Sequence, residues 1–146
     1  MRRMQFAALA LVPVLVVGCS GTTSIAVDDL TGTWNATQFQ FTNTANPAQT
    51  VDLITLGATF TLNILADGDY TATVQEPGEL TETLVGTLTV SGDAITIAES
   101  GQGSPTLFTA ARSGNTLTLT TTDEEFDFDE DDIEEPASLR MVLQKM

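Results

Sequence analysis

Two neighbouring runs, Ala58-Thr59-Phe60-Thr61-Leu62-Asn63-Ile64 and Tyr70-Thr71-Ala72-Thr73-Val74, alternate apolar and polar side chains. Successive side chains of a β-strand point to opposite faces, so each run places its apolar residues on one face. Between the runs lies Asp67-Gly68-Asp69, and glycine allows the positive φ that tight hairpin turns need. These residues predict a β-hairpin with one buried face and one face in water.

The same alternation recurs along the chain, at residues 84–90, 117–120 and 139–143. Further turn signals occur at Ser91-Gly92-Asp93 and Ser113-Gly114-Asn115. We expect about eight or nine strands joined mainly as hairpins. Such an up-and-down order removes its free strand edges best by closing on itself, so the fold class is predicted to be all-β, a small antiparallel up-and-down β-barrel. A two-sheet β-sandwich is the alternative.

The first expected strand contains a conflict of parity. Trp34 lies at an even position, whereas Phe39 and Phe41 lie at odd positions. One regular strand cannot bury all three rings, because its side chains alternate between the two faces. The sequence therefore predicts a β-bulge or a change of face between Trp34 and Phe39.

The chain begins with Arg2 and Arg3, followed by an apolar segment over residues 4–17 in which Gln5 is polar. A segment of about 14 residues is too short to span a hydrocarbon core about 30 Å thick. It has the length and flanking charge of a secretory signal peptide. A buried core helix would instead show polar residues at every third or fourth position.

The segment Val16-Val17-Gly18-Cys19 resembles the lipobox of bacterial lipoproteins. The resemblance implies that a diacylglycerol is attached to Cys19, that residues 1–18 are cleaved off, and that the new amino terminus is acylated, for example with palmitate. Stable anchoring does require more than one acyl chain. Residues 19–29 would then be the lipidated cysteine and a flexible linker. Ser20 implies the outer membrane of the cell envelope, if the cell is Gram-negative. An ordinary leader with a free thiol is the alternative.

Three later motifs resemble those of lipocalin-like lipoproteins: Leu30-Thr31-Gly32-Thr33-Trp34, Asp67-Gly68-Asp69-Tyr70 and Gly114-Asn115-Thr116-Leu117-Thr118-Leu119. The resemblance covers residues 30–146 and implies a lipocalin-like barrel whose tryptophan closes the bottom. It also implies binding of a small apolar or amphipathic ligand, or of an envelope protein. Arg140 has the parity of the outer wall, which argues against a contact with Trp34. The sequence does not identify the ligand-binding residues; the inward candidates Phe60, Leu62, Tyr70 and Leu88 are expected to be core.

The whole chain has a formal net charge of −15, with 5 basic and 20 acidic residues. Removal of residues 1–18 takes away Arg2 and Arg3 and no acidic residue, which leaves −17. This charge argues against nucleic acid as a partner, because affinity for nucleic acid depends on Lys and Arg that neutralise phosphates. The membrane is therefore expected as a partner through the lipid anchor alone.

Candidate catalytic groups are few. The chain contains no histidine and a single cysteine, so it lacks the commonest general base and cannot form an internal disulfide. No Gly-X-Ser-X-Gly motif occurs, and Ser100-Gly101-Gln102-Gly103-Ser104 reads as a polar loop. The sequence predicts that the protein is not an enzyme.

Ten of the thirteen residues from Asp123 to Glu135 are Asp or Glu. Asp127, Asp129 and Asp131 supply carboxylates at alternate positions, as in the first half of an EF-hand loop, and Ca²⁺ prefers such oxygen ligands. The EF-hand pattern then fails, because Asp132 stands where that loop needs glycine and Ser138 where it needs glutamate. A looser Ca²⁺ site and a solvated acidic loop both remain open. Phe126 and Phe128 are expected to hold this loop against the barrel.

Overall fold

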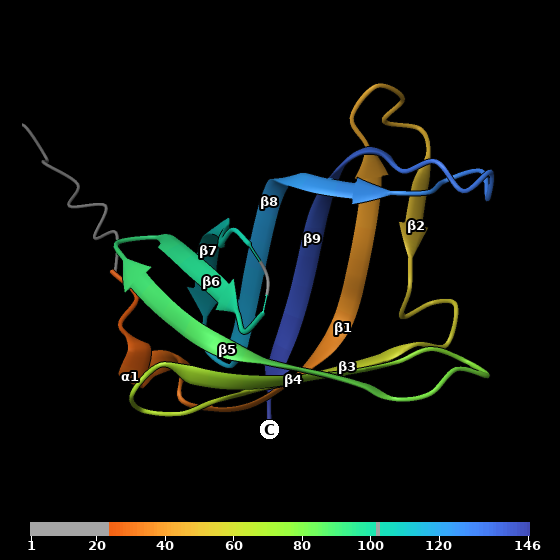
Figure 1. The fold of residues 1–146 in the computed structure, drawn as a ribbon. Helices are drawn as coiled ribbons and strands as arrows, with labels where there is room; N and C mark the ends of the chain where they lie inside the picture. Colours follow the sequence, from red (N-terminus) through yellow and green to blue (C-terminus); the bar gives the residue numbers. More distant parts are fainter. Residues whose placement is uncertain (1–23, 102) are drawn as a thin grey trace, which may run out of the picture.

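The computed structural model describes residues 24–101 and 103–146, which form an all-β fold with one short helix (Figure 1). Cys19 and the expected signal peptide, residues 1–18, lie outside the described residues. The elements are α1 (Val27–Leu30), β1 (Gly32–Asn43), β2 (Thr50–Asp52), β3 (Thr59–Ile64), β4 (Asp69–Gln75), β5 (Glu82–Ser91), β6 (Ala94–Glu99), β7 (Thr106–Ser113), β8 (Thr116–Phe126) and β9 (Glu135–Lys145).

Eight antiparallel strands close into a barrel in the order β1, β3, β4, β5, β6, β7, β8, β9, and β9 pairs with β1 again. The closing pair is long, with a register that runs from Trp34 opposite Lys145 to Asn43 opposite Ala137. This pair decides between the two expected architectures, because a sandwich would leave β1 and β9 as separate edges. The predicted up-and-down barrel is confirmed.

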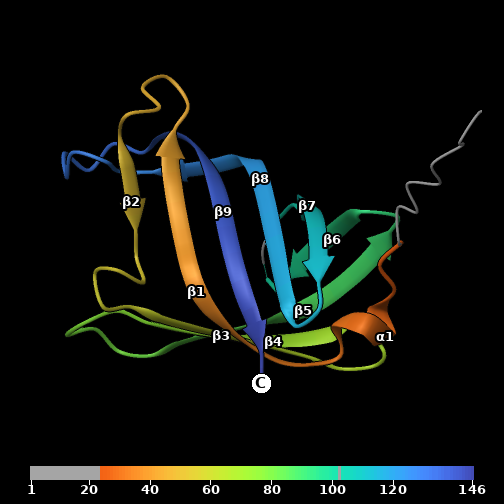
Figure 2. The same cartoon turned by 180° about the vertical axis from the view of Figure 1, so that it is seen from behind.

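The ninth strand, β2, lies outside the closed ring. It pairs with the second half of β1, from Gln40 opposite Asp52 to Thr42 opposite Thr50. The first half of the same β1 edge pairs with β3, from Gly32 opposite Ile64 to Asn35 opposite Thr61. Figures 1 and 2 show β2 standing beside the far end of β1, well separated from β3.

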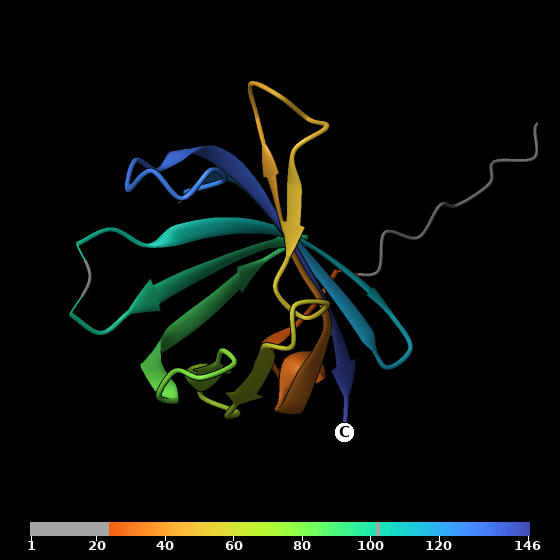
Figure 3. The same ribbon diagram turned by 90° about the vertical axis from the view of Figure 1, so that its right-hand side faces the viewer.

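The turns predicted from glycine occur where expected. Gly68, Gly92 and Gly114 join β3 to β4, β5 to β6 and β7 to β8, each with a positive φ. Gly68 has a second constraint, since a Cβ there would lie 2.5 Å from the carbonyl oxygen of Leu88. These three turns lie at one end of the barrel, and Figure 3 shows the β6–β7 and β8–β9 loops on the side opposite the β7–β8 turn.

The predicted irregularity in β1 is present as a β-bulge. The register against β9 shifts between Ala36 and Gln38, so that Thr37 is the extra residue. The shift allows Trp34, which is fully buried, and Phe39, which packs on the core, to face the same interior. A second register shift lies between Thr121 and Glu124 in β8. It turns the even positions after it, Glu124 and Phe126, to the face that odd positions occupy before it.

The end of the barrel with the three glycine turns is closed by α1 and Trp34. Leu30 and Trp34 are both fully buried, and the indole Nε1 donates a hydrogen bond to the Leu30 carbonyl oxygen at 2.7 Å. The Lys145 ammonium lies 5.2 Å from the centre of the Trp34 ring, within the range of a cation–π contact. Arg140 lies on the outer wall, as its parity predicted, and its guanidinium donates to the side-chain oxygen of Gln38.

The packed part of the protein begins inside the segment expected to be a linker. Ile25 and Val27 pack against the core, and the backbone N–H of Ile25 donates to the Gly92 carbonyl at 3.2 Å. Asp29 also forms an ion pair with Arg112 at 3.1 Å. Within the described ranges, no helix combines the length and apolar character needed to cross a membrane.

Candidate functional site

A cavity of about 440 Å³ occupies the half of the barrel away from α1, within the range typical of small-molecule sites. Its wall is predominantly apolar and aromatic. The lining includes Phe39, Phe60, Tyr70, Leu84, Glu99 and Glu124. They come from β1, β3, β4, β5, β6 and β8, so the cavity is a property of the closed barrel and of no single hairpin.

The bulge in β1 supplies the aromatic part of this wall. Beyond Thr37, the inward positions of β1 are Phe39 and Phe41, whose ring centres are 5.6 Å apart. The ring of Phe60 on β3 lies 5.3 Å from that of Phe39. Tilted aromatic pairs at such distances are favourable beyond the area that they bury. The three rings therefore form an apolar wall at this end of the barrel.

The bulge in β8 brings one more ring and one carboxylate inward. Because of the register shift, Glu124 lies opposite the fully buried Ala137 on β9 and shares its face. Phe126 follows with the same parity and stacks on Phe41, with ring centres 4.5 Å apart and planes 22° apart. Phe128 contacts Phe126 edge to face at 5.0 Å. The expected anchoring of the acidic loop by Phe126 and Phe128 is confirmed.

Tyr70 forms part of the cavity wall because β5 has a glycine opposite it. Tyr70 pairs with Gly86, and a Cβ at Gly86 would lie 2.9 Å from Tyr70 Cε1. Burial raises the pKa of the Tyr70 phenol, and the negative charge of Glu99 raises it further. Tyr70 is therefore a neutral hydroxyl at physiological pH, able to donate or accept a hydrogen bond.

Two carboxylates lie in this otherwise apolar wall, Glu99 at the end of β6 and Glu124 in β8. Burial is the main cause that raises the pKa of the Glu124 carboxyl, and the neighbouring charge of Asp123 adds to it. Both causes disfavour the charged form of a carboxylic acid. The polar side chains of the cavity wall are therefore these two carboxyl groups and the hydroxyls of Tyr70, Ser104 and Thr106.

A second hollow, of about 530 Å³, lies on the outer wall over β1, β9, β8 and β7. Five threonines line it, including Thr109 and Thr120, and Arg140 lies at its side. None of its lining residues is aromatic, whereas aromatic side chains line the cavity inside the barrel, as they do in most ligand pockets. The cavity inside the barrel is therefore the stronger candidate site.

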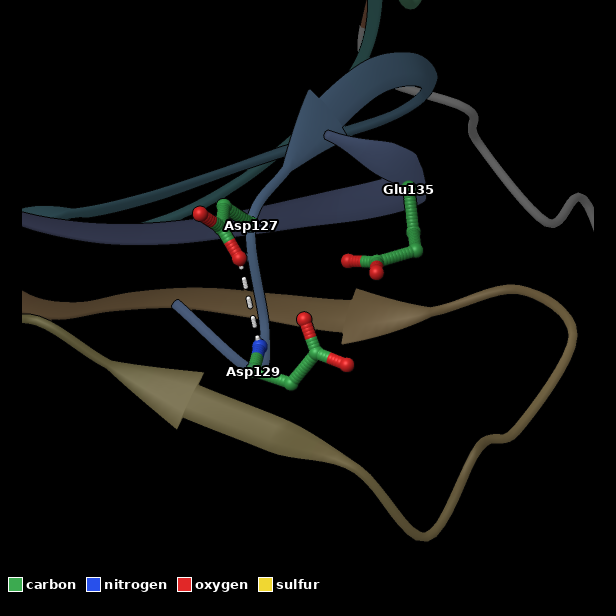
Figure 4. A group of neighbouring side chains, drawn as sticks. All are labelled: Asp127, Asp129 and Glu135. Carbon is green, nitrogen blue, oxygen red and sulfur yellow. Dashed lines mark hydrogen bonds between the residues drawn. The ribbon is translucent and has the colours of Figure 1, made fainter. Parts of the chain in front are cut away.

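The acidic β8–β9 loop is organised around Asp127 (Figure 4). Its Oδ1 accepts backbone N–H bonds from Asp129, Glu130 and Asp131 at 3.3, 2.7 and 3.2 Å. Glu135 Oε2 accepts the N–H of Phe128 at 3.0 Å. Bonds of this kind, from backbone N–H groups to a nearby side-chain carboxylate, are those of Asx turns.

Of the three residues predicted as Ca²⁺ ligands, the structure brings Asp127 and Asp129 together with Glu135, whose ligand oxygens all lie within 4.8 Å of one another (Figure 4). The Asp131 carboxylate instead accepts the N–H of Ile133 at 2.9 Å. An all-oxygen set suits Ca²⁺, but three carboxylates supply fewer than the six to eight oxygens that it takes. A Ca²⁺ ion at this loop stays a prediction.

The residues that sequence reasoning missed are Glu99 and Glu124. Glu99 has the inward parity of Ile95 and Ile97, but a carboxylate at the end of a strand is ordinarily expected in solvent. Glu124 could be found only by noticing that Phe126 has opposite parity to Leu117 and Leu119, which again indicates a bulge. Of the four inward candidates, Phe60, Leu62 and Tyr70 line the cavity, whereas Leu88 lies in the core outside it.

Comparison with known proteins assigns no family to the chain. No family model, no curated protein and no solved structure shows a significant match to the chain.

Proposed function

We propose that this protein is a membrane-anchored bacterial lipoprotein whose lipocalin-like barrel binds a small apolar or amphipathic ligand. The observation that carries the proposal is the cavity of about 440 Å³, with its aromatic and aliphatic wall, at the end of the barrel away from α1. A barrel with a completely filled interior would serve better as a structural or interaction module. Enclosure of this kind is what ligand pockets in barrel mouths have in common.

Binding can be measured on the barrel domain, defined here as residues 20–146. This segment includes every strand of the closed barrel and all residues of its hydrophobic core. Native mass spectrometry of the purified domain is expected to show a co-purified mass of lipid size. A clean apoprotein mass under conditions that preserve other lipid complexes would favour the alternative, a non-catalytic envelope module.

A blocking substitution gives a sharper test. Leu84 lines the cavity, whereas Val85 is 47% exposed on the outer face. Leu84→Trp is expected to raise the Kd of a neutral apolar fluorescent dye at least about tenfold, a loss of about 1.4 kcal/mol, by filling part of the cavity. The matched control Val85→Trp is expected to leave the Kd unchanged.

Equal dye binding by both tryptophan variants would place the dye outside the barrel and contradict the proposal. Thr106→Trp, at a second position of the cavity wall, provides an independent block if Leu84→Trp does not fold. Thermal melting of each variant separates lost binding from lost structure.

The anchor rests on Cys19 and on where the chain enters the fold. Ile25 bonds to Gly92 in the β5–β6 turn, next to α1 and at the end opposite the cavity. A lipid on Cys19 would therefore hold the closed end of the barrel toward the membrane and leave the cavity facing away from it. The net charge of −17 after cleavage also disfavours contact with an anionic membrane surface.

Metabolic labelling with a palmitate analogue tests the anchor. The wild-type chain is expected to take up label and to fractionate with membranes, and Cys19→Ser is expected to lose both properties, because the thiol is the attachment point. Label that survives the substitution would refute lipidation at Cys19. Ser20→Ala serves as the neighbouring control and is expected to keep the label.

A further inference from the structure

Two carboxyl side chains lie at separate points of the cavity wall. Glu99 follows Ile95 and Ile97 along the inward face of β6. Glu124 is turned inward by the bulge in β8 and lies opposite Ala137. Both residues line the same cavity, together with the hydroxyl of Tyr70.

No basic side chain of the described residues balances these carboxylates. Arg112, Arg140 and Lys145 are the lysines and arginines of the chain beyond residue 23, and none of them lines the cavity. Arg112 forms its ion pair with Asp29 at the closed end. Lys145 lies over Trp34 at that same end, and Arg140 bonds to Gln38 on the outer wall.

An anionic ligand in this cavity would meet like charge without a counterion. Burial and, to a smaller extent, the charge of Asp123 raise the pKa of Glu124, since both disfavour a further negative charge at this point. A carboxylate-headed ligand would add to that repulsion in a partly desolvated site, where charges interact more strongly than in water. A cationic group would relieve it by pairing with Glu99 or Glu124.

The aromatic wall favours the same ligand. The rings of Phe39 and Phe60, 5.3 Å apart, line the cavity together with the two carboxylates. A cation close to an aromatic face is attracted by the negative charge of the ring face. The rings and the carboxylates thus act in the same direction on a positively charged group, and the aliphatic part of the wall accepts an apolar chain.

We propose that the barrel selects amphiphiles with a positively charged end, held between Glu99, Glu124 and the phenylalanine rings, and disfavours fatty-acid anions. This assignment rests on the proposed ligand-binding function and specifies the chemical class of its ligand. The site is the aromatic-lined cavity, and the carboxylates determine which head group it accepts. The strongly negative charge of the whole domain attracts cations as well, so the experiment has to separate the two contributions.

The test compares three probes with the same apolar chain: decyltrimethylammonium, decanol and decanoate. Each is titrated below its micelle concentration against the barrel domain loaded with the neutral dye, at neutral pH and moderate salt. The cation is expected to displace the dye at a concentration at least about tenfold lower than decanoate, with decanol between them, because opposite and like charges act on the same head-group position.

Three variants locate the source of the preference. Glu99→Gln and Glu124→Gln, singly and together, remove a cavity charge with little change of shape, and the double variant is expected to bring the three probes to similar affinities. The matched control is Glu125→Gln, because Glu125 is adjacent in the chain, exposed and absent from the cavity wall. It removes the same charge from the domain and is expected to leave the preference within about twofold of wild type.

The outcomes are distinguishable. If neither the dye nor any probe binds, the ligand-binding function itself fails, and this inference fails with it. If all three probes bind equally well to the wild-type domain, or decanoate binds best, the function stands and the inference is overturned. A preference for the cation that Glu125→Gln reduces as much as Glu124→Gln does would assign it to the overall charge and overturn the site. Melting curves identify any variant that fails to fold. If Glu99→Gln or Glu124→Gln does not fold, the other single variant shows whether a cavity carboxylate causes the preference.

Discussion

Trp34→Ala is expected to lower the free energy of unfolding of the barrel domain by about 4 kcal/mol, within the range typical of truncating a buried tryptophan. Trp34 is fully buried, and it closes the end of the barrel beneath Leu30 and Lys145. Alanine would leave a cavity there and would remove both the hydrogen bond to Leu30 and the cation–π contact. Urea unfolding followed by far-ultraviolet circular dichroism measures the loss.

Trp34→Phe is the control that separates packing from hydrogen bonding. Phenylalanine keeps most of the ring but leaves the Leu30 carbonyl without the indole N–H, which is expected to cost about 1–3 kcal/mol. A smaller loss for alanine than for phenylalanine, or a loss below about 1 kcal/mol for alanine, would contradict the view that this tryptophan is the plug of the barrel.

Gly86→Ala is expected to destabilise the domain by at least about 3 kcal/mol, at the upper end of overpacking effects. A Cβ at Gly86 would overlap the carbonyl oxygen of Ala98 on β6 and would lie 2.9 Å from Tyr70 Cε1. The carbonyl belongs to the neighbouring strand and cannot move without breaking the ladder. The same unfolding experiment measures the effect.

Gly103→Ala is the matched control for Gly86. Gly103 also lines the cavity, but a Cβ there meets no other atom within 4 Å. Its substitution is expected to change stability by no more than about 0.5 kcal/mol. Similar losses for both variants would show that the close approach at Gly86 is relieved by local movement.

The strand pattern and its turns could be read from the chain because both depend on neighbouring residues. Alternation in residues 58–64 and 70–74 specifies which side chains share a face, and Gly68 specifies where the chain reverses. The same logic correctly indicated a bulge between Trp34 and Phe39, since three large rings with conflicting parity cannot all be buried otherwise.

The interior could not be read in the same way. The segment that includes Val27 looks like a polar linker, yet it forms α1 and closes the barrel because Leu30 finds a partner in Trp34, which no local pattern reveals. A basic residue does lie over Trp34, but it is Lys145, which the register between β1 and β9 places there. Arg140 faces the other side of the same strand.

The candidate site also depends partly on local sequence and partly on the tertiary structure. The sequence by itself determined that the chain forms antiparallel strands with defined inward and outward faces, because side-chain alternation and turn chemistry act over a few residues. Only the tertiary structure decided that β9 returns to β1, that a cavity remains between the walls, and that Glu99 and Glu124 line it. Those features depend on register and on bulges across strands far apart in the chain, where a shift of one residue exchanges the inside of a barrel for its outside.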